Sequence, residues 1–198
     1  MSAGAPHTDR GGPDDRDPDP HDPHDIAVLM RDPAWRSTVP EAEACCRAAA
    51  RATIAAVARA TGRTTPAAAC ALAIMLADDI FLRQLNQRYR SRDAATNVLA
   101  FPSGDGDSLT RVHSEDVAPR ALGDVAIARE TVLREAAAQG KARGDHLRHL
   151  VVHGVLHLFG YDHLTAGDAA EMEAIEVAVL AGLGVTDPYA EPPRTGGS

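Results

Sequence analysis

The stretch 153–163, His-Gly-Val-Leu-His-Leu-Phe-Gly-Tyr-Asp-His, constrains the fold of this chain more than any other segment. The apolar residues before and within it predict a helix that begins at Asp145, a residue type favoured at helix N-caps, and ends near Leu158. Within that helix His153 and His157 are four residues apart, so their side chains lie on one face, one turn above the other.

Gly160 follows the predicted helix and supplies the left-handed residue that closes many helices. The chain can therefore turn back and bring His163 to the point that the two helical histidines face. Three converging imidazoles with a fourth position left open are typical of a catalytic zinc site. We predict one zinc ion bound by His153, His157 and His163, on a helix and the turn that follows it. The alternative for each histidine taken alone is a hydrogen-bonded core residue.

The histidine spacing also resembles His-Glu-x-x-His-x-x-Gly-x-x-His, the long signature of zinc peptidases. This chain has Gly154 at the position of the glutamate, which is the general base of those enzymes. Glycine has no side chain that can accept a proton from a zinc-bound water. A zinc metallopeptidase therefore stays open as an alternative, but without its central residue.

The distribution of charge limits the partners of this chain. Its 198 residues carry a formal net charge of −8. Residues 1–25 hold seven aspartates and two arginines, a net charge of −5, which leaves −3 for the remainder. A domain with this net negative charge does not attract nucleic acid in general. Binding of RNA would require a local basic patch, and DNA is not expected as a partner. The Asp- and Pro-rich residues 1–25 and the Pro- and Gly-rich residues 191–198 are predicted to be disordered tails of one domain, 26–190.

The sequence also indicates a cellular setting. No apolar run approaches the length of a membrane span, and the acidic, Pro-rich N-terminus does not resemble a secretory signal. The three cysteines, Cys45, Cys46 and Cys70, are odd in number and two are adjacent, so no disulfide framework is predicted. We expect a cytoplasmic protein with no membrane partner.

Hydrophobic patterns predict an α+β domain. Four apolar runs indicate strands, at 26–30, 70–76, 97–101 and 121–128. Five helices are predicted. The first runs from a capping box at Thr38 to about residue 60, and the second from residue 78 or 79 to about 89. The other three span 127–139, 145–158 and 168–180. Strands and helices alternate early, and helices dominate late. We therefore expect a small, mostly parallel (mixed) sheet of about four strands, covered by about five helices.

Three segments taken together resemble one known family. Residues 153–163 match the pattern His-Gly-x-Leu/Val-His-Leu-x-Gly-Tyr-Asp-His, and 122–124 match Leu-Gly-Asp. Residues 85–102 resemble Leu-Asn-x-x-Tyr-Arg followed by Thr-Asn/Asp-Val-Leu-Ser-Phe-Pro. These motifs, in this order, are similar to those of the YbeY family of metal-dependent endoribonucleases, the rRNA maturation factors. The resemblance covers residues 26–190.

The resemblance implies a bacterial, cytoplasmic, metal-dependent endoribonuclease of the single-strand type. It further implies a role in 16S rRNA 3′-end maturation and ribosome quality control, with rRNA and the small ribosomal subunit as partners. The zinc histidines of the family map onto the three histidines predicted above, and its functionally important arginine maps onto Arg90. Ala100 and the pair Ala94-Ala95 depart from the family's usual serine and Lys-Pro, and none of them is a metal ligand. A non-catalytic ribosome-assembly factor with a zinc site remains an alternative, which a site with an open position does not favour.

For the reaction we hypothesise metal-assisted cleavage of an RNA phosphodiester, with either water or the 2′-hydroxyl of RNA as the attacking group. Arg90 would bind phosphate through its planar guanidinium. The alternative role for Arg90 is a surface cation near a helix C-terminus, a favourable place for positive charge. Arg88 and Arg92 flank it, and either complete a basic patch or stay solvated.

Three further residues are candidates for supporting roles. His149 lies one turn before His153 and either assists proton transfer or is a buried structural histidine. Asp162 either accepts a hydrogen bond from a ligand imidazole or caps the turn after Gly160. Asp124 either orients the metal site or bonds neighbouring backbone.

Overall fold

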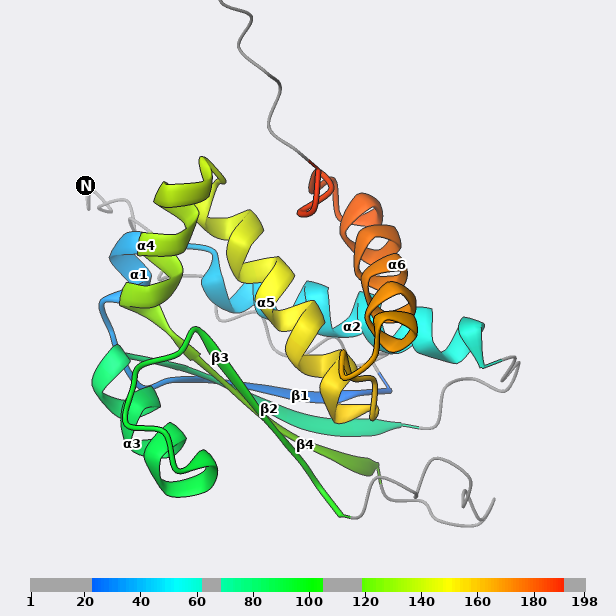
Figure 1. The fold of residues 1–198 in the computed structure, drawn as a ribbon, viewed down its shortest axis with the longest axis horizontal. Coiled ribbons are helices and arrows are strands. Elements are labelled where there is room, and N and C mark those ends of the chain that lie inside the picture. The colour runs from blue at the N-terminus through cyan, green and yellow to red at the C-terminus, as the bar shows by residue number, and fades with distance from the viewer. Residues whose placement is uncertain (1–22, 62–68, 105–118, 191–198) are drawn as a thin grey trace, which may run out of the picture.

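The computed structural model of this protein describes residues 23–61, 69–104 and 119–190 (Figure 1). Nearly all of the two predicted tails lies outside these ranges. Asp25, which the prediction placed in the first tail, is the first residue of a strand. His24 beside it accepts a hydrogen bond from the backbone N–H of Cys70 at 3.2 Å.

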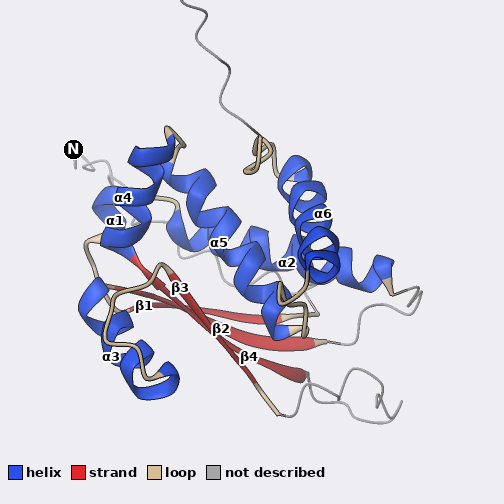
Figure 2. Ribbon diagram, in the orientation of Figure 1, coloured by secondary structure: helices blue, strands red, loops and turns tan. Residues whose placement is uncertain are grey.

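The structure confirms the predicted α+β class. Among the described residues it has four strands: β1 (Asp25–Met30), β2 (Cys70–Ala77), β3 (Val98–Pro102) and β4 (Arg120–Ala128). It has six helices there: α1 (Trp35–Thr38), α2 (Ala42–Ala60), α3 (Asp79–Arg90), α4 (Arg129–Gln139), α5 (Arg143–Leu158) and α6 (Ala166–Gly182). The four predicted strands and five predicted helices are present (Figure 2), whereas the short α1 was not predicted. No helix in the described part of the chain is long and apolar enough to cross a membrane.

The sheet is mixed, with the strand order β1-β2-β4-β3. β1 pairs with β2, and β2 with β4, in parallel, whereas β3 runs antiparallel to β4. The prediction of a mostly parallel sheet is therefore confirmed. Among the described strands β3 pairs with β4 alone, so it forms one edge of the sheet.

Helices cover the two faces of the sheet unequally (Figure 1). α2, α5 and α6 lie on one face, and α3 packs on the other. Side chains alternate along β4, because successive strand residues point to opposite faces. Val125 and Ile127 belong to the core under α5, whereas Ala126 and Ala128 belong to a smaller core with Leu82 of α3.

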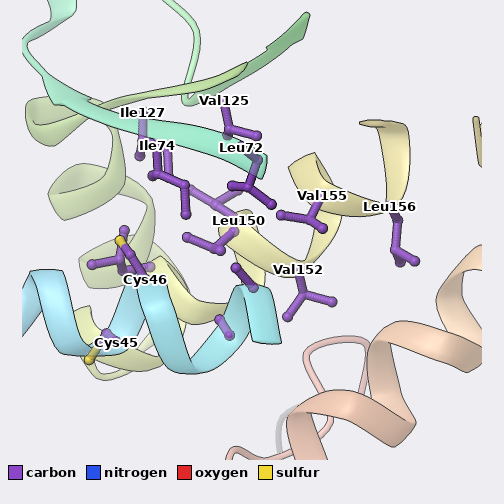
Figure 3. Packing of buried hydrophobic residues seen from close by; sticks show 14 of the residues in the cluster. Cys45, Cys46, Leu72, Ile74, Val125, Ile127, Leu150, Val152, Val155 and Leu156 are labelled. Carbon is purple, nitrogen blue, oxygen red and sulfur yellow. The ribbon is translucent and has the colours of Figure 1, made fainter. Parts of the chain in front are cut away.

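The larger core fixes the position of α5 (Figure 3). Leu72 and Ile74 of β2 lie in one cluster with Val152 and Val155 of α5. Cys46 of α2 is buried in the same cluster as a free thiol. Each fully buried valine, leucine or isoleucine side chain stabilises such a core by about 1.5–3 kcal/mol. α5 is therefore held rigidly along its buried face, which positions the side chains on its other face.

Two helix starts differ from the predictions. α2 begins at Ala42 without a side-chain cap, because the Thr38 hydroxyl donates back to the carbonyl of Ala34 around α1. α5 begins at Arg143, two residues before Asp145. Asp145 lies in the first turn, where a carboxylate interacts favourably with the helix dipole but does not cap the helix.

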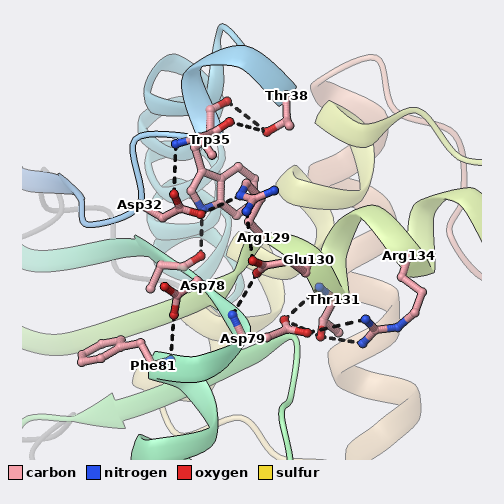
Figure 4. A network of polar contacts seen from close by, with 12 residues as sticks. Asp32, Trp35, Thr38, Asp78, Asp79, Phe81, Arg129, Glu130, Thr131 and Arg134 are labelled. Carbon is pink, nitrogen blue, oxygen red and sulfur yellow. Dashed lines mark hydrogen bonds and ion pairs between the residues drawn. The ribbon is translucent and has the colours of Figure 1, made fainter.

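A polar network joins the loops at the carboxyl ends of the three parallel strands (Figure 4). Asp32, which follows β1, accepts a hydrogen bond from Nε of Arg129 at 2.6 Å. Asp79, at the start of α3, accepts from the backbone N–H and the hydroxyl of Thr131 at 3.0 and 2.7 Å. The backbone N–H of Asp79 donates to Glu130 at 2.9 Å. These bonds hold the start of α4 against the ends of β1 and β2, and α4 leads directly into α5.

Gly123, the glycine of the Leu-Gly-Asp segment, allows β3 to lie close to β4. Its φ is +127°, and a Cβ atom there would overlap the carbonyl oxygen of Phe101 in β3. Any side chain at this position would therefore push the edge strand away from the sheet.

Candidate metal centre

The three histidines predicted as ligands converge at the C-terminal end of α5. His153 and His157 lie one turn apart, and their Nε2 atoms are 3.1 Å apart. The chain then turns at Gly160, whose φ of +89° is left-handed as predicted. The turn brings the centre of the His163 ring to 5.7 Å from that of His153 and 5.2 Å from that of His157.

The geometry of these nitrogens suits a metal ion. One nitrogen of each ring lies within 4.8 Å of those of the other two. A tetrahedral zinc ion would place two ligand nitrogens about 3.3 Å apart, close to the separation of His153 and His157. In the described ranges, this is the one group of three or more histidine, cysteine or acidic side chains close enough to share an ion. Imidazoles also suit copper, nickel and iron, so the donors alone do not choose the ion.

The environment favours the neutral form of His157. Burial lowers the pKa of its imidazole, and the neighbouring rings of His153 and His163 lower it further. Metal binding requires the neutral form, because a protonated ring nitrogen has no free lone pair. His157 is therefore ready to coordinate a metal at neutral pH.

Glu176 of α6 contacts His153 at Nδ1, the ring nitrogen that does not face His157. Its Oε1 lies 2.8 Å from Nδ1 of His153, and its side chain is completely buried. A carboxylate in this position accepts the Nδ1 proton of a neutral imidazole. The lone pair of Nε2 is then left for a metal.

Two more groups share the Glu176 carboxylate. The Tyr189 hydroxyl donates to Oε2, and Nε2 of His149 lies 3.4 Å from the same oxygen. Burial alone raises the pKa of Glu176, but the hydrogen bonds from His149, His153 and Tyr189 outweigh burial and lower the pKa to about 2. Glu176 is thus ionised at neutral pH, and it links His149 to the histidine cluster.

Asp162 contacts the third histidine. Its Oδ1 accepts a hydrogen bond from the backbone N–H of His163 at 2.7 Å and lies 3.0 Å from Nδ1 of the same ring. Asp162 therefore both contacts the imidazole and closes the turn. The side-chain bond to His163 is the largest cause that lowers the pKa of Asp162. More than half of the His163 side chain, 58%, is exposed, so the cluster opens to solvent on this side.

The histidine-bearing segment lies inside a longer match to a known family. The family model described as Endoribonuclease YbeY matches residues 39–184, which is most of the chain. The chain belongs to the endoribonuclease YbeY family.

Two relatives that carry the family's name agree with the family match. A protein of Paramagnetospirillum magneticum named Endoribonuclease YbeY is 47% identical over 167 residues, which cover 84% of this chain and 96% of the relative. A protein of Azorhizobium caulinodans with the same name is 46% identical over 168 residues, 85% of this chain and 98% of the relative. A Thermotoga maritima protein solved in solution covers 84% of this chain and 99% of its own, with 18% identity and a TM-score of 0.46.

Two predicted site residues of this YbeY-family chain lie away from the histidines. Arg90 is exposed and is the last residue of α3, a helix that packs on the face of the sheet opposite α5. Asp124 is exposed in β4 and shares a face with Ala126, since residues two apart in a strand point the same way. The sheet therefore separates both residues from the cluster. The prediction that Asp124 orients the metal site has no support in this geometry.

Gly154, at the position of the peptidase glutamate, faces the sheet and not the cluster. A Cβ atom there would lie 2.8 Å from Cγ1 of Val125 and 3.3 Å from Cγ2 of Val98. A glutamate would have to displace these side chains of β4 and β3. In this YbeY-family chain the glycine allows α5 to pack closely on the sheet, which leaves the peptidase alternative without support.

Sequence reasoning missed Glu176 and Tyr189. A signal for Glu176 existed, because it lies between Met172 and Val179 on the apolar face of α6, where a carboxylate needs polar partners. Met172 and Val179 themselves are buried core residues. Tyr189 follows α6 and lies beyond the residues matched to the YbeY family, and no periodicity marks it.

Proposed function

We propose that this chain is a metal-dependent endoribonuclease that cleaves single-stranded RNA. The proposal is carried by the convergence of His153, His157 and His163 at a site open to solvent. Membership of a family whose relatives are named Endoribonuclease YbeY supports it. We further propose a role in 16S rRNA 3′-end maturation and ribosome quality control, with rRNA and the small ribosomal subunit as partners.

His153, His157 and His163 would hold one zinc ion. A bound zinc ion would polarise a phosphoryl oxygen and lower the pKa of a water molecule to about 7. Glu176 orients His153 through the 2.8 Å contact, and Asp162 orients His163 through the 3.0 Å contact. These carboxylates fix the rings before RNA binds, so little reorganisation is needed during the reaction. The attacking group is either water or the 2′-hydroxyl of the RNA.

Arg90 is proposed to bind the RNA phosphate backbone. Its guanidinium makes no ion pair with any residue that the structure describes. Arg88 and Arg92 are exposed next to it, which gives this end of α3 a local positive charge. Tyr89 contacts Phe101 of β3 edge-on, with ring centres 5.2 Å apart, so the end of α3 lies against the edge strand. RNA that passes the free edge of β3 would reach Arg90 on one face and the histidines on the other.

One alternative, an assembly factor with a structural zinc, makes different predictions. A structural zinc is normally enclosed by four protein ligands, and its removal unfolds the domain. The other alternative, a peptidase, should cleave casein and lose that activity on chelation. Both alternatives can be tested with the same preparation of metal-loaded protein.

The test is cleavage of a labelled 16S rRNA 3′ fragment by metal-loaded, full-length protein, with metal content measured for each variant. We expect wild type to cleave, His157→Ala to lose both metal and cleavage, and Arg90→Ala to keep metal but lose cleavage. Arg59→Ala removes an exposed arginine from α2 and should behave like wild type. If all four preparations cleave equally, the activity belongs to a contaminant, and the assembly-factor alternative is favoured.

A further inference from the structure

A cavity of about 250 Å³ adjoins the candidate metal centre. His146, His149 and His153 of α5 line it together with Glu135 and Gln139 of α4 and Tyr189. His153 belongs to both sites, since it lines the cavity and its Nε2 lies 3.1 Å from Nε2 of His157. A molecule in the cavity would therefore lie directly beside the histidine cluster.

Two residues that line the cavity each have a buried ring nitrogen without a hydrogen-bond partner in the described ranges. Nδ1 of His146 and Nδ1 of His149 are buried, and neither has a hydrogen-bond partner within the described ranges. His146 is almost completely buried, with 3% of its surface exposed, and its Nε2 lies 2.8 Å from Oε2 of Glu135. These two nitrogens have almost no accessible surface and so lie behind the cavity wall. Asn97, Glu135 and Gln139 are the lining residues whose side chains can form hydrogen bonds with a bound group.

The charge and the shape of the cavity restrict that group. Its lining contains no lysine or arginine, and the Glu135 carboxylate would repel a phosphate. Val98 and Leu150 add apolar surface to the lining. The aromatic rings of His149 and Tyr189 also line the cavity, with their centres 5.7 Å apart. The volume is below the roughly 300–1,000 Å³ of sites for drug-sized ligands. These properties suit a flat, neutral heterocycle that stacks on aromatic rings, as unpaired RNA bases do.

We propose that this cavity binds an unpaired nucleobase of the RNA, next to the phosphodiester that is cleaved. The inference rests on the proposed endoribonuclease function and names a subsite for its substrate. Glu135 already accepts hydrogen bonds from Asn97 at 3.0 Å and from His146 at 2.8 Å. A carboxylate has about four acceptor positions, so capacity remains for the amino group of cytosine, adenine or guanine. Uracil has no such amino group and is expected to bind more weakly.

The first experiment removes single bases from the substrate. A short single-stranded RNA is prepared with one abasic nucleotide at each position around the cleaved bond, and kcat/KM is measured with metal-loaded, full-length protein. We expect one abasic position next to that bond to lower kcat/KM about tenfold, the typical effect of losing one stacked base. In the variants Glu135→Gln and Gln139→Ala, an abasic nucleotide at that position should lower kcat/KM much less than it does in wild type. Glu43→Gln, which changes a partly exposed carboxylate on α2, should keep this sensitivity.

The second experiment measures binding without catalysis. Adenosine, cytidine and uridine are titrated into the zinc-loaded protein, with ribose as the control, and the ring signals of His146, His149 and Tyr189 are followed by NMR. Adenosine and cytidine should shift these signals at lower concentrations than uridine, and ribose should not. Equal binding of uridine would overturn the role of Glu135.

The two experiments separate the subsite from the proposed function. Cleavage without sensitivity to any abasic position, together with no shift by any nucleoside, would overturn the base subsite and leave the endoribonuclease proposal standing. Shifts of the cavity signals by nucleosides in a protein that cuts no RNA would support base binding by the cavity, but would overturn the endoribonuclease proposal and the placement of the base beside a cleaved bond.

Discussion

Oε1 of Glu176 lies 2.8 Å from Nδ1 of His153 and connects α6 to the histidine cluster on α5. The carboxylate is completely buried, and the Tyr189 hydroxyl and His149 bond its other oxygen. Such partners of ligand histidines fix both the tautomer and the orientation of the ring. The contact thus makes the affinity of the candidate metal site depend on a helix that contributes no ligand.

We therefore expect Glu176→Gln to weaken zinc binding about 10- to 100-fold. The amide keeps the shape of the side chain but has only one acceptor oxygen. In wild type, His153, His149 and Tyr189 share the two carboxylate oxygens. Affinity is measured by competition with a chromophoric chelator, and circular dichroism checks the fold. Glu173→Gln, on the exposed face of the same helix, serves as the control. Unchanged zinc affinity in folded Glu176→Gln would show that the contact does not position the ligand.

Chelation of the metal is expected to leave the domain folded. The cluster lies at the end of α5, whose opposite face is fixed in the core by residues such as Val152 and Val155. Removing a bound ion lowers stability only by the ligand's mass-action contribution, RT ln(1 + [L]/Kd). Thermal unfolding with and without EDTA should therefore show a shifted but still cooperative transition. Loss of the transition on chelation would identify the zinc as structural.

Gly154→Ala should destabilise the protein although alanine is the better helix former. The new Cβ would lie 2.8 Å from Cγ1 of Val125, and overpacking of this kind costs about 1–3 kcal/mol. The helix preference of alanine offsets about 1 kcal/mol of that loss. Urea unfolding measures the difference. Gly182→Ala, at the end of α6 with no atom near the new Cβ, should not destabilise.

A double-mutant cycle tests the cause of the Gly154→Ala effect. In a Val125→Ala background the valine methyl groups are absent, so the added Cβ of residue 154 has room. Gly154→Ala should then lower the free energy of unfolding less than it does beside Val125. An equal loss in both backgrounds would mean that contact with Val125 is not responsible.

The ion pair between Asp32 and Arg129 should make stability depend on pH. Burial raises the pKa of Asp32, but the hydrogen bonds from Arg129 and from the backbone of Ala34 outweigh burial and lower the pKa. Because the pKa is lower in the folded state, the pair stabilises the fold above the ordinary aspartate pKa of about 3.9. This contribution is lost as the pH falls through the lower, folded-state pKa.

Asp32→Asn is therefore expected to lower the free energy of unfolding by about 2 kcal/mol at pH 7. Below about pH 4 the difference from wild type should shrink, because the wild-type carboxyl also becomes neutral. Urea unfolding at several pH values measures both effects. Asp93→Asn, which breaks an exposed pair with Arg83, should have a smaller effect because solvent screens that pair. A difference that stays constant with pH would contradict the assigned role of Asp32.

Local structure followed from local sequence in this protein. The apolar runs located the strands. The spacing of His153 and His157 placed both on one helix face, because the backbone hydrogen bonds of a helix connect near neighbours in the chain. The left-handed turn at Gly160 was predictable for the same reason, since only glycine adopts that conformation without strain. The position of Thr38 was not, because its hydroxyl bonds the carbonyl of Ala34 and not the helix that follows.

Contacts between distant elements were decided only by the tertiary structure. Glu176 reaches His153 because α6 packs beside α5, and no pattern in the 22 residues between them specifies that packing. Arg90 and Asp124 lie across the sheet from the histidines because α3 packs on the opposite face and side chains alternate along β4. The sequence determined which helix and turn carry the three histidines. Packing free energies summed over the whole core decided which carboxylates support the histidines. They also decided that α3, which ends at Arg90, packs on the opposite face of the sheet.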